Sequence, residues 1–160
     1  MKIKLNYLII PLITVAVAAL GSLFSFSGME WYDLTLKTPS FTPPKWAFPI
    51  AWNLIFLLTT VSALIVWNKP GFFERRKFEY GFLIGLFIVN AVLNVLWSAI
   101  FFGAHLLGAA VIEIAFLWAT ILGMIIFSWK ISRLASLLLL PYLLWVSLAS
   151  VLTYSIWILN

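Results

Sequence analysis

Five long apolar stretches dominate this 160-residue chain, and each is long enough to cross a lipid bilayer as a helix. Hydrophobic residues make up 64% of the sequence and charged residues only 9%. The stretches do not alternate apolar with polar residues, as the strands of membrane barrels do. We therefore predict an all-α, multi-pass membrane protein with a single five-helix domain. The expected spans cover residues 5–27, 47–67, 78–102, 106–128 and 134–159, with an aromatic lid loop at residues 28–46.

The basic residues indicate how the chain is threaded through the membrane. The chain has ten basic and five acidic residues, and the basic residues lie in short segments beside the apolar stretches. This distribution argues against a nucleic-acid partner and is typical of a topology signal. We predict a cytoplasmic N-terminus, with the lid loop on the opposite side of a cell membrane. The cytoplasmic side would carry Lys2, Lys4, Lys69, Arg75, Arg76, Lys77, Lys130 and Arg133, and the other side Lys37 and Lys45.

The first apolar stretch has a second interpretation. Lys2 and Lys4, followed by an apolar run and small residues at 16–18, resemble a cleavable signal peptide. The run continues to Phe26, however, and carries Gly21 and Ser25 at a spacing that favours close helix packing. We expect the first helix to be retained.

The chain has no cysteine and one histidine, His105. Disulfides, thiolate catalysis and cysteine-ligated metals are therefore excluded, and one histidine does not make a multi-histidine metal site. We expect neither a metal nor a cofactor, and we expect His105 to be an exposed loop residue.

The segment from Trp31 to Trp52 is unusually rich in aromatic residues and prolines for a membrane loop. Indole and phenol rings offer flat apolar faces with a polar edge, and prolines restrict the backbone that carries them. The segment is therefore suited to hold a flat ligand. Its rings and prolines are Trp31, Tyr32, Phe41, Trp46, Phe48, Trp52, Pro39, Pro43, Pro44 and Pro49.

Two spans carry mixed aromatic and polar faces at matching depth. Aromatic belts explain tryptophans near span ends, but Trp52, Trp97 and Trp145 lie well inside their spans, where an indole N–H needs a partner. We predict that the two faces line one cavity beneath the loop; the alternative is that the asparagines only bond neighbouring helices. The faces comprise Asn90, Asn94, Trp97 and Phe101 in the third span, and Tyr142, Trp145, Ala149 and Thr153 in the fifth.

Glu113 and a glycine pair stand out among the remaining span residues. An ionisable group inside a span is costly when charged, so Glu113 is either a functional residue or a residue paired with a neighbouring helix. Gly81 and Gly85 form a G-x-x-x-G pattern, which lets two helices approach closely. We expect a homodimer through these glycines, with packing inside the bundle as the competing interpretation.

Several spaced motifs together resemble the tryptophan-rich sensory protein and mitochondrial translocator protein family, also known as the peripheral benzodiazepine receptor family. The resemblance runs from about residue 21 to residue 157. The motifs are Trp31-Tyr32, Lys37-Thr38-Pro39, Pro43-Pro44-Lys45-Trp46, Trp52, Leu93-Asn94 with Trp97, Phe101-Phe102-Gly103-Ala104 and Pro141-Tyr142-Leu143-Leu144-Trp145.

The resemblance implies a dimeric five-helix bundle that binds porphyrins such as protoporphyrin IX, and benzodiazepine-site ligands, in a pocket capped by the first loop. It also implies light- and oxygen-dependent breakdown of porphyrins. By position, Trp52 and Trp145 match the tryptophans linked to that chemistry, and Trp31 and Tyr32 match the lid. The positions that match the drug site are Asn94, Trp97, Ala149 and Leu152.

The sequence also departs from the family pattern. The family's sterol-recognition stretch needs a basic residue after its tyrosine, and none follows Leu152-Thr153-Tyr154, which argues against a sterol site. In the loop, Thr38 separates Lys37 from Pro39, and Phe41 replaces a tryptophan, so local contacts there are expected to differ.

The residues and the resemblance agree on a tetrapyrrole ligand held between aromatic side chains, including Trp46, with amides such as Asn90 and Asn94 meeting its polar edges. Its propionates would pair with Lys37 or Lys45 at the mouth. Two alternatives remain: a small transporter in which Glu113 is the protonatable coupling site, and a structural protein whose loop binds another protein.

Overall fold

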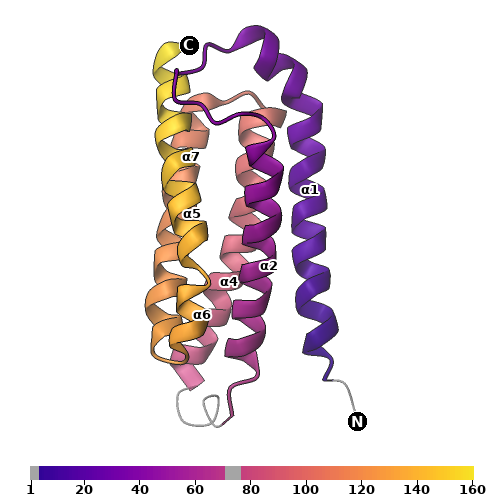
Figure 1. The fold of residues 1–160 in the computed structure, drawn as a ribbon, viewed down its shortest axis with the longest axis vertical. Helices are drawn as coiled ribbons and strands as arrows, with labels where there is room; N and C mark the ends of the chain where they lie inside the picture. The colour runs from indigo at the N-terminus through magenta and orange to yellow at the C-terminus, as the bar shows by residue number, and fades with distance from the viewer. Residues whose placement is uncertain (1–3, 71–76) are drawn as a thin grey trace.

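The computed structural model describes residues 4–70 and 77–160, and within them it is entirely helical (Figure 1). Five helical segments are long and apolar enough to span a membrane, which confirms the predicted all-α, five-span architecture. Lys2, Arg75 and Arg76, used for the topology prediction, lie outside the described residues. The elements are α1 (Asn6–Thr35), α2 (Ala47–Trp67), α4 (Lys77–Ser98), the π-helix η1 (Ala99–Gly103), α5 (Leu107–Trp129), α6 (Arg133–Leu137) and α7 (Leu140–Leu159).

Successive spans run in opposite directions, so the loop between α1 and α2 lies at the same end of the bundle as the C-terminal end of α7 (Figure 1). We refer to this end as the loop end. The core is centred on α5, which packs against α4 through Leu83 and Met124 and against α7 through Ile121 and Val146. Within α1, whose residues are all described, Gly28 alone is buried. This helix therefore stands at the edge of the bundle.

The first helix is longer than its apolar run predicts. We expected it to end near residue 27 and the lid loop to begin at residue 28, but α1 continues to Thr35. The stretch from Gly28 to Thr35 contains no proline, and Pro39 is the first residue after it that cannot donate a backbone hydrogen bond. The loop is therefore confined to residues 36–46, and Trp31 and Tyr32 are helical residues.

Two spans are interrupted where the chain must bend. At the loop end, η1 follows α4 with a wider turn, in which the Ala104 N–H donates to the Ala99 carbonyl at 2.8 Å, and His105 then adopts a positive φ of 58°. In the last span, expected as one helix over 134–159, a turn separates α6 from α7. Pro141 explains this break, because its ring would clash with the carbonyl four residues earlier in a continuous helix.

Hydroxyl groups hold the short helix α6 in place. The Ser62 hydroxyl of α2 donates to the Ala135 carbonyl at 2.8 Å, and the Ser136 hydroxyl donates to the Ile125 carbonyl of α5 at 2.7 Å. Both serines are buried. These bonds satisfy polar groups that the turn would otherwise leave unpaired in an apolar environment.

Candidate ligand cavity

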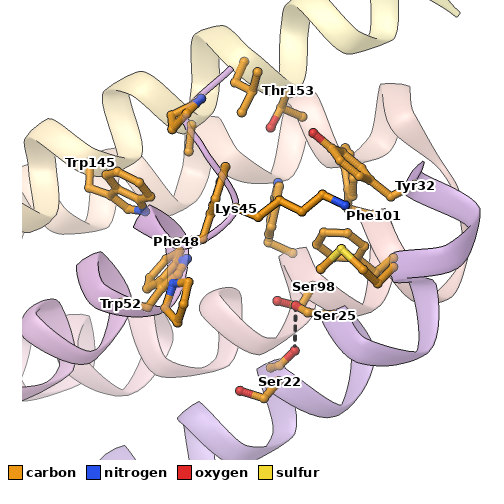
Figure 2. A pocket seen from close by; sticks show the side chains of 18 of the residues that line it. Ser22, Ser25, Tyr32, Lys45, Phe48, Trp52, Ser98, Phe101, Trp145 and Thr153 are labelled. Atoms are coloured by element: carbon orange, nitrogen blue, oxygen red, sulfur yellow. Dashed lines mark hydrogen bonds between the residues drawn. The ribbon is translucent and has the colours of Figure 1, made fainter. Parts of the chain in front are cut away.

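A cavity of about 630 Å³ lies inside the loop end of the bundle. Its walls come from α1, α2, the 36–46 loop, α4 with η1, α5 and α7, so residues from every span meet there (Figure 2). Phe26 of α1 and Asn53 of α2 belong to the wall and are exposed.

One wall is built from aromatic residues of α2 and α7. The Phe48 ring lies edge-on to Trp145, with centroids 5.5 Å apart. Trp52 stacks on Phe56 at 5.6 Å and meets the Tyr142 ring edge-on at 6.1 Å. These contacts hold two of the three tryptophans predicted inside their spans, Trp52 and Trp145, on the same side of the cavity (Figure 2).

The opposite wall is built from rings of α1, α4 and η1. Trp97 stacks on Phe101, with centroids 5.1 Å apart and planes only 19° from parallel. Phe101 in turn packs against Phe102 and Tyr32. The space between the walls is thus enclosed by aromatic faces on two sides, which suits a flat apolar ligand.

A hydrogen-bond network lies behind the cavity wall. Asn94 lines the cavity and donates its amide N–H to the Tyr142 hydroxyl at 3.0 Å. That hydroxyl donates to the Asn90 side-chain oxygen at 3.2 Å, and the Asn90 amide donates to Thr120 of α5 at 3.0 Å. Asn90 therefore bonds neighbouring helices and lies outside the wall, while Asn94 both bonds Tyr142 and borders the cavity.

At the loop end of the cavity, the described lining residues include one lysine. The Lys45 ammonium group lies 2.7 Å from the Asp33 carboxylate, and both residues belong to the wall. Lys37, the other lysine proposed for the mouth, lies outside it. The Lys37 backbone N–H and carbonyl are bonded to the Asn160 side chain, at 2.9 and 3.0 Å. This amide ties the loop to the end of α7.

Two further residues proposed as ligand contacts lie outside the cavity wall. Trp31 stacks on His105, with ring centroids 3.9 Å apart and planes 9° from parallel. Trp46 precedes α2 with 67% of its surface exposed, as an interfacial tryptophan would be. Tyr32, Trp52, Asn94, Trp97, Trp145, Ala149 and Leu152 all lie in the wall.

Sequence reasoning missed Asp33 as a cavity residue. The sequence predicts a loop over residues 28–46, and side-chain directions in a loop are not periodic. The available signal was helical spacing, since Met29 and Asp33 are four residues apart and both line the cavity. Ser22 and Asn53, which also line the cavity, carried no distinguishing sequence signal.

Glu113 is buried in α5 with 6% of its surface exposed, and neither of its carboxyl oxygens has a hydrogen-bond partner within the described part of the chain. Pairing with a neighbouring helix, one of the two interpretations of Glu113, is therefore not seen among the described residues. The Trp97 indole N–H is also buried and without a described partner. The hydrogen bond between Asn90 and Thr120 fixes the register of the antiparallel helices α4 and α5. Trp97 lies seven residues after Asn90, and Glu113 lies seven residues before Thr120. The two side chains are therefore at the same level, about two helical turns nearer the loop end.

Comparisons with known proteins agree with this architecture. Residues 9–158 match the TspO/MBR family. The Tryptophan-rich protein TspO of Chlorobaculum tepidum is 39% identical over 147 residues, covering 91% of this chain and 90% of that protein. Protein CrtK of Rhodobacter capsulatus is 35% identical over 147 residues, covering 91% and 89%. The human Translocator protein is 29% identical over 130 residues, covering 81% and 75%.

These matches confirm the family resemblance drawn from the tryptophan and proline motifs. The five apolar helices and the family match together identify a multi-pass membrane protein. Since the family match covers nearly the whole sequence, the chain belongs to the TspO/MBR family.

Proposed function

We propose that this protein binds a tetrapyrrole, with protoporphyrin IX as the model ligand, in the cavity at the loop end. The observation that supports this proposal is the pair of aromatic walls, with Trp52 and Trp145 on one side and Trp97 stacked on Phe101 on the other. The volume of about 630 Å³ falls within the range of roughly 300–1,000 Å³ that is usual for small-molecule sites. A synthetic benzodiazepine-site ligand would fit the same aromatic environment.

The polar groups of the wall suggest how such a ligand is oriented. Asn94 lies in the inner part of the wall, where its amide can meet a polar ring edge. Lys45 lies in the loop, where the ends of a porphyrin's propionates avoid the cost of entering hydrocarbon. The macrocycle would thus insert between the aromatic walls with its acidic edge toward the loop.

We further propose that the bound porphyrin is degraded in light and oxygen. Light-excited porphyrin would take one electron from the indole of Trp52 or Trp145, giving a porphyrin radical anion and an indole radical cation. Dioxygen would add to the radical anion, and return of the electron to the indole would leave both oxygen atoms on the macrocycle, which opens as the O–O bond and a ring C–C bond break. The support for this step is the position of two easily oxidised indoles in the wall of the proposed binding site. The protein's contribution is to hold the ligand beside these donors.

The experiment compares wild-type protein with Trp52→Phe, Trp145→Phe and the double variant. Protoporphyrin IX is titrated in detergent, with binding read from the shift of the porphyrin absorbance bands, because the substitutions remove fluorophores. Samples are then illuminated in air, and the loss of the bands is followed. Trp129→Phe is the matched control, since Trp129 is exposed and lies outside the cavity wall.

We expect saturable binding in all variants and light-driven loss of porphyrin only where the cavity tryptophans are present. Degradation at the wild-type rate in the double variant would refute the indole step. Absence of saturable binding at micromolar porphyrin would refute the ligand assignment itself.

A second candidate function is proton-coupled transport, which is favoured by Glu113, because it is buried and has no hydrogen-bond partner among the residues that the structure describes. Five spans form no pair of equal repeats, which many secondary transporters have. Proteoliposomes loaded with porphyrin would test it. Transport predicts release that responds to a pH gradient and is lost in Glu113→Gln, whereas binding alone predicts no such response.

A further inference from the structure

The cavity carries an acidic residue beside its one described lysine. Asp33 lies in the last turn of α1, and Lys45 lies at the end of the loop, just before α2. Their side chains meet at 2.7 Å, with 33% of the Asp33 side chain and 73% of the Lys45 side chain exposed. The Lys45 side chain runs across the mouth toward the side where Tyr32 lies (Figure 2).

This pair has a consequence for any acidic ligand. The Lys45 ammonium is already bound to a carboxylate, so a ligand carboxylate must compete with Asp33 for it. The Asp33 carboxylate also repels a second negative charge brought to the mouth. A neutral ligand meets neither obstacle.

The pair is also weak enough to open. An ion pair between a largely exposed lysine and a partly exposed aspartate contributes little net stability, because water reaches both charges and the long lysine chain loses freedom when it is held. The Asn160 side chain ties the loop to α7 at Lys37, so the loop does not depend on the Asp33–Lys45 contact alone for its position. Lys45 can therefore change partners while the loop remains attached.

We propose that Asp33 determines ligand specificity: it competes with a ligand's carboxylates for Lys45 and so lowers the affinity for acidic tetrapyrroles relative to neutral ones. This inference rests on the proposed function, since it concerns the same cavity. It assigns to Lys45 two alternating partners, Asp33 in the free protein and a ligand carboxylate in the complex. It leaves Lys37 without a direct role in binding.

The test uses two ligands that differ in charge and share the same macrocycle: protoporphyrin IX, with two propionates, and its dimethyl ester, which has no acid. Affinities are measured in detergent in the dark by tryptophan quenching, for the wild type, Asp33→Asn and Lys45→Gln. Glu30→Gln is the matched control, because Glu30 lies on α1 one turn earlier and is exposed outside the cavity wall. It removes the same charge without touching the pair.

We expect Asp33→Asn to tighten binding of the diacid by roughly two- to fivefold, the range for an exposed ion pair, and to leave the diester within about twofold. Lys45→Gln should weaken the diacid only, and Glu30→Gln should change neither ligand. Added salt should reduce the difference between wild type and Asp33→Asn.

Four outcomes would overturn the inference. Equal changes for diacid and diester in Asp33→Asn would show that the residue acts on the shape of the loop. An equal gain in Glu30→Gln would show that the overall charge of the helix end matters and not the pair. Unchanged affinities in every variant would remove Asp33 from ligand selection while leaving the proposed function intact, whereas failure of wild type to bind either ligand would refute the proposed function as well.

Discussion

Gly28 packs so closely against Phe102 that a Cβ atom on the glycine would lie 2.4 Å from the Phe102 carbonyl oxygen. This contact joins α1 to the π-helix η1, and Gly28 is the buried residue of α1. The neighbouring atom is backbone and cannot rotate away. The contact therefore fixes how close α1 comes to the bundle, and with it the width of the cavity beside Tyr32.

Gly28→Ala is expected to destabilise the protein by about 1–3 kcal/mol, because α1 must move outward to relieve the clash. The thermal midpoint in detergent should fall, and porphyrin affinity should fall with it. Gly21→Ala on the same helix is the control. Its Cβ would lie 3.6 Å from the Ser98 hydroxyl, an ordinary contact, and alanine favours the helix by about 1 kcal/mol over glycine. Equal midpoints for the two variants would contradict the packing argument.

Tyr142→Phe should destabilise the protein without changing the shape of the core. The substitution removes the hydroxyl that accepts from Asn94 and donates to Asn90, and it leaves both amides short of a partner. Hydrogen bonds between membrane helices are worth about 0.6–2 kcal/mol each, so a loss of about 1–3 kcal/mol is expected. Thermal unfolding in detergent measures it. Tyr154→Phe, at an exposed position on the same helix, should leave the midpoint unchanged; a similar drop there would show that the network is not the cause.

The number of spans, and the residues that α4 and η1 contribute to the cavity wall, could be predicted from the sequence for simple physical reasons. A span must be apolar along its whole length, so five spans are visible as five apolar runs. Asn94 and Trp97 share a helical face with Phe101, and this spacing alone brings them to the same wall.

The end of α1 could not be read in this way. Hydropathy marks where a helix leaves the hydrocarbon, whereas hydrogen bonding determines where it ends, and α1 continues through Glu30 and Asp33 to Thr35. The extra turns carry Tyr32 and Asp33 into the cavity wall and turn Trp31 onto His105. The partners of Lys45 and Lys37 depend on that geometry, so sequence reasoning treated the two lysines as equivalent.

Glu113→Leu is expected to raise thermal stability. The carboxyl group is buried without a described hydrogen-bond partner, and leucine fills a similar volume without a polar group to desolvate. The gain should be about 1–3 kcal/mol, measured as a higher thermal midpoint in detergent. Glu113→Gln retains a buried polar group and should give a smaller gain or none. A large loss of stability in Glu113→Leu would show that the carboxyl group has a partner in the folded protein.

We propose that the glycine pair of α4 forms the interface of a homodimer. A Cβ on Gly81 or Gly85 would meet nothing within 4 Å, so the described part of the chain leaves this face of α4 uncovered. Ile88 and Val92 continue the same face at helical spacing and are exposed. Glycines packed inside the bundle, the competing interpretation, would have close neighbours.

Replacing both glycines by leucine should therefore convert a dimer to a monomer without lowering the thermal midpoint of the monomer, since a Cβ at either position meets no described atom within 4 Å and leucine favours a helix over glycine. Light scattering after size exclusion in detergent measures the mass, and cross-linking in membranes checks it where lipid is present. Ala109→Leu, at an exposed position of α5, is the control and should remain dimeric. If the double leucine variant associates as strongly as wild type, the exposed face of α4 is covered by lipid, and the dimer uses another helix.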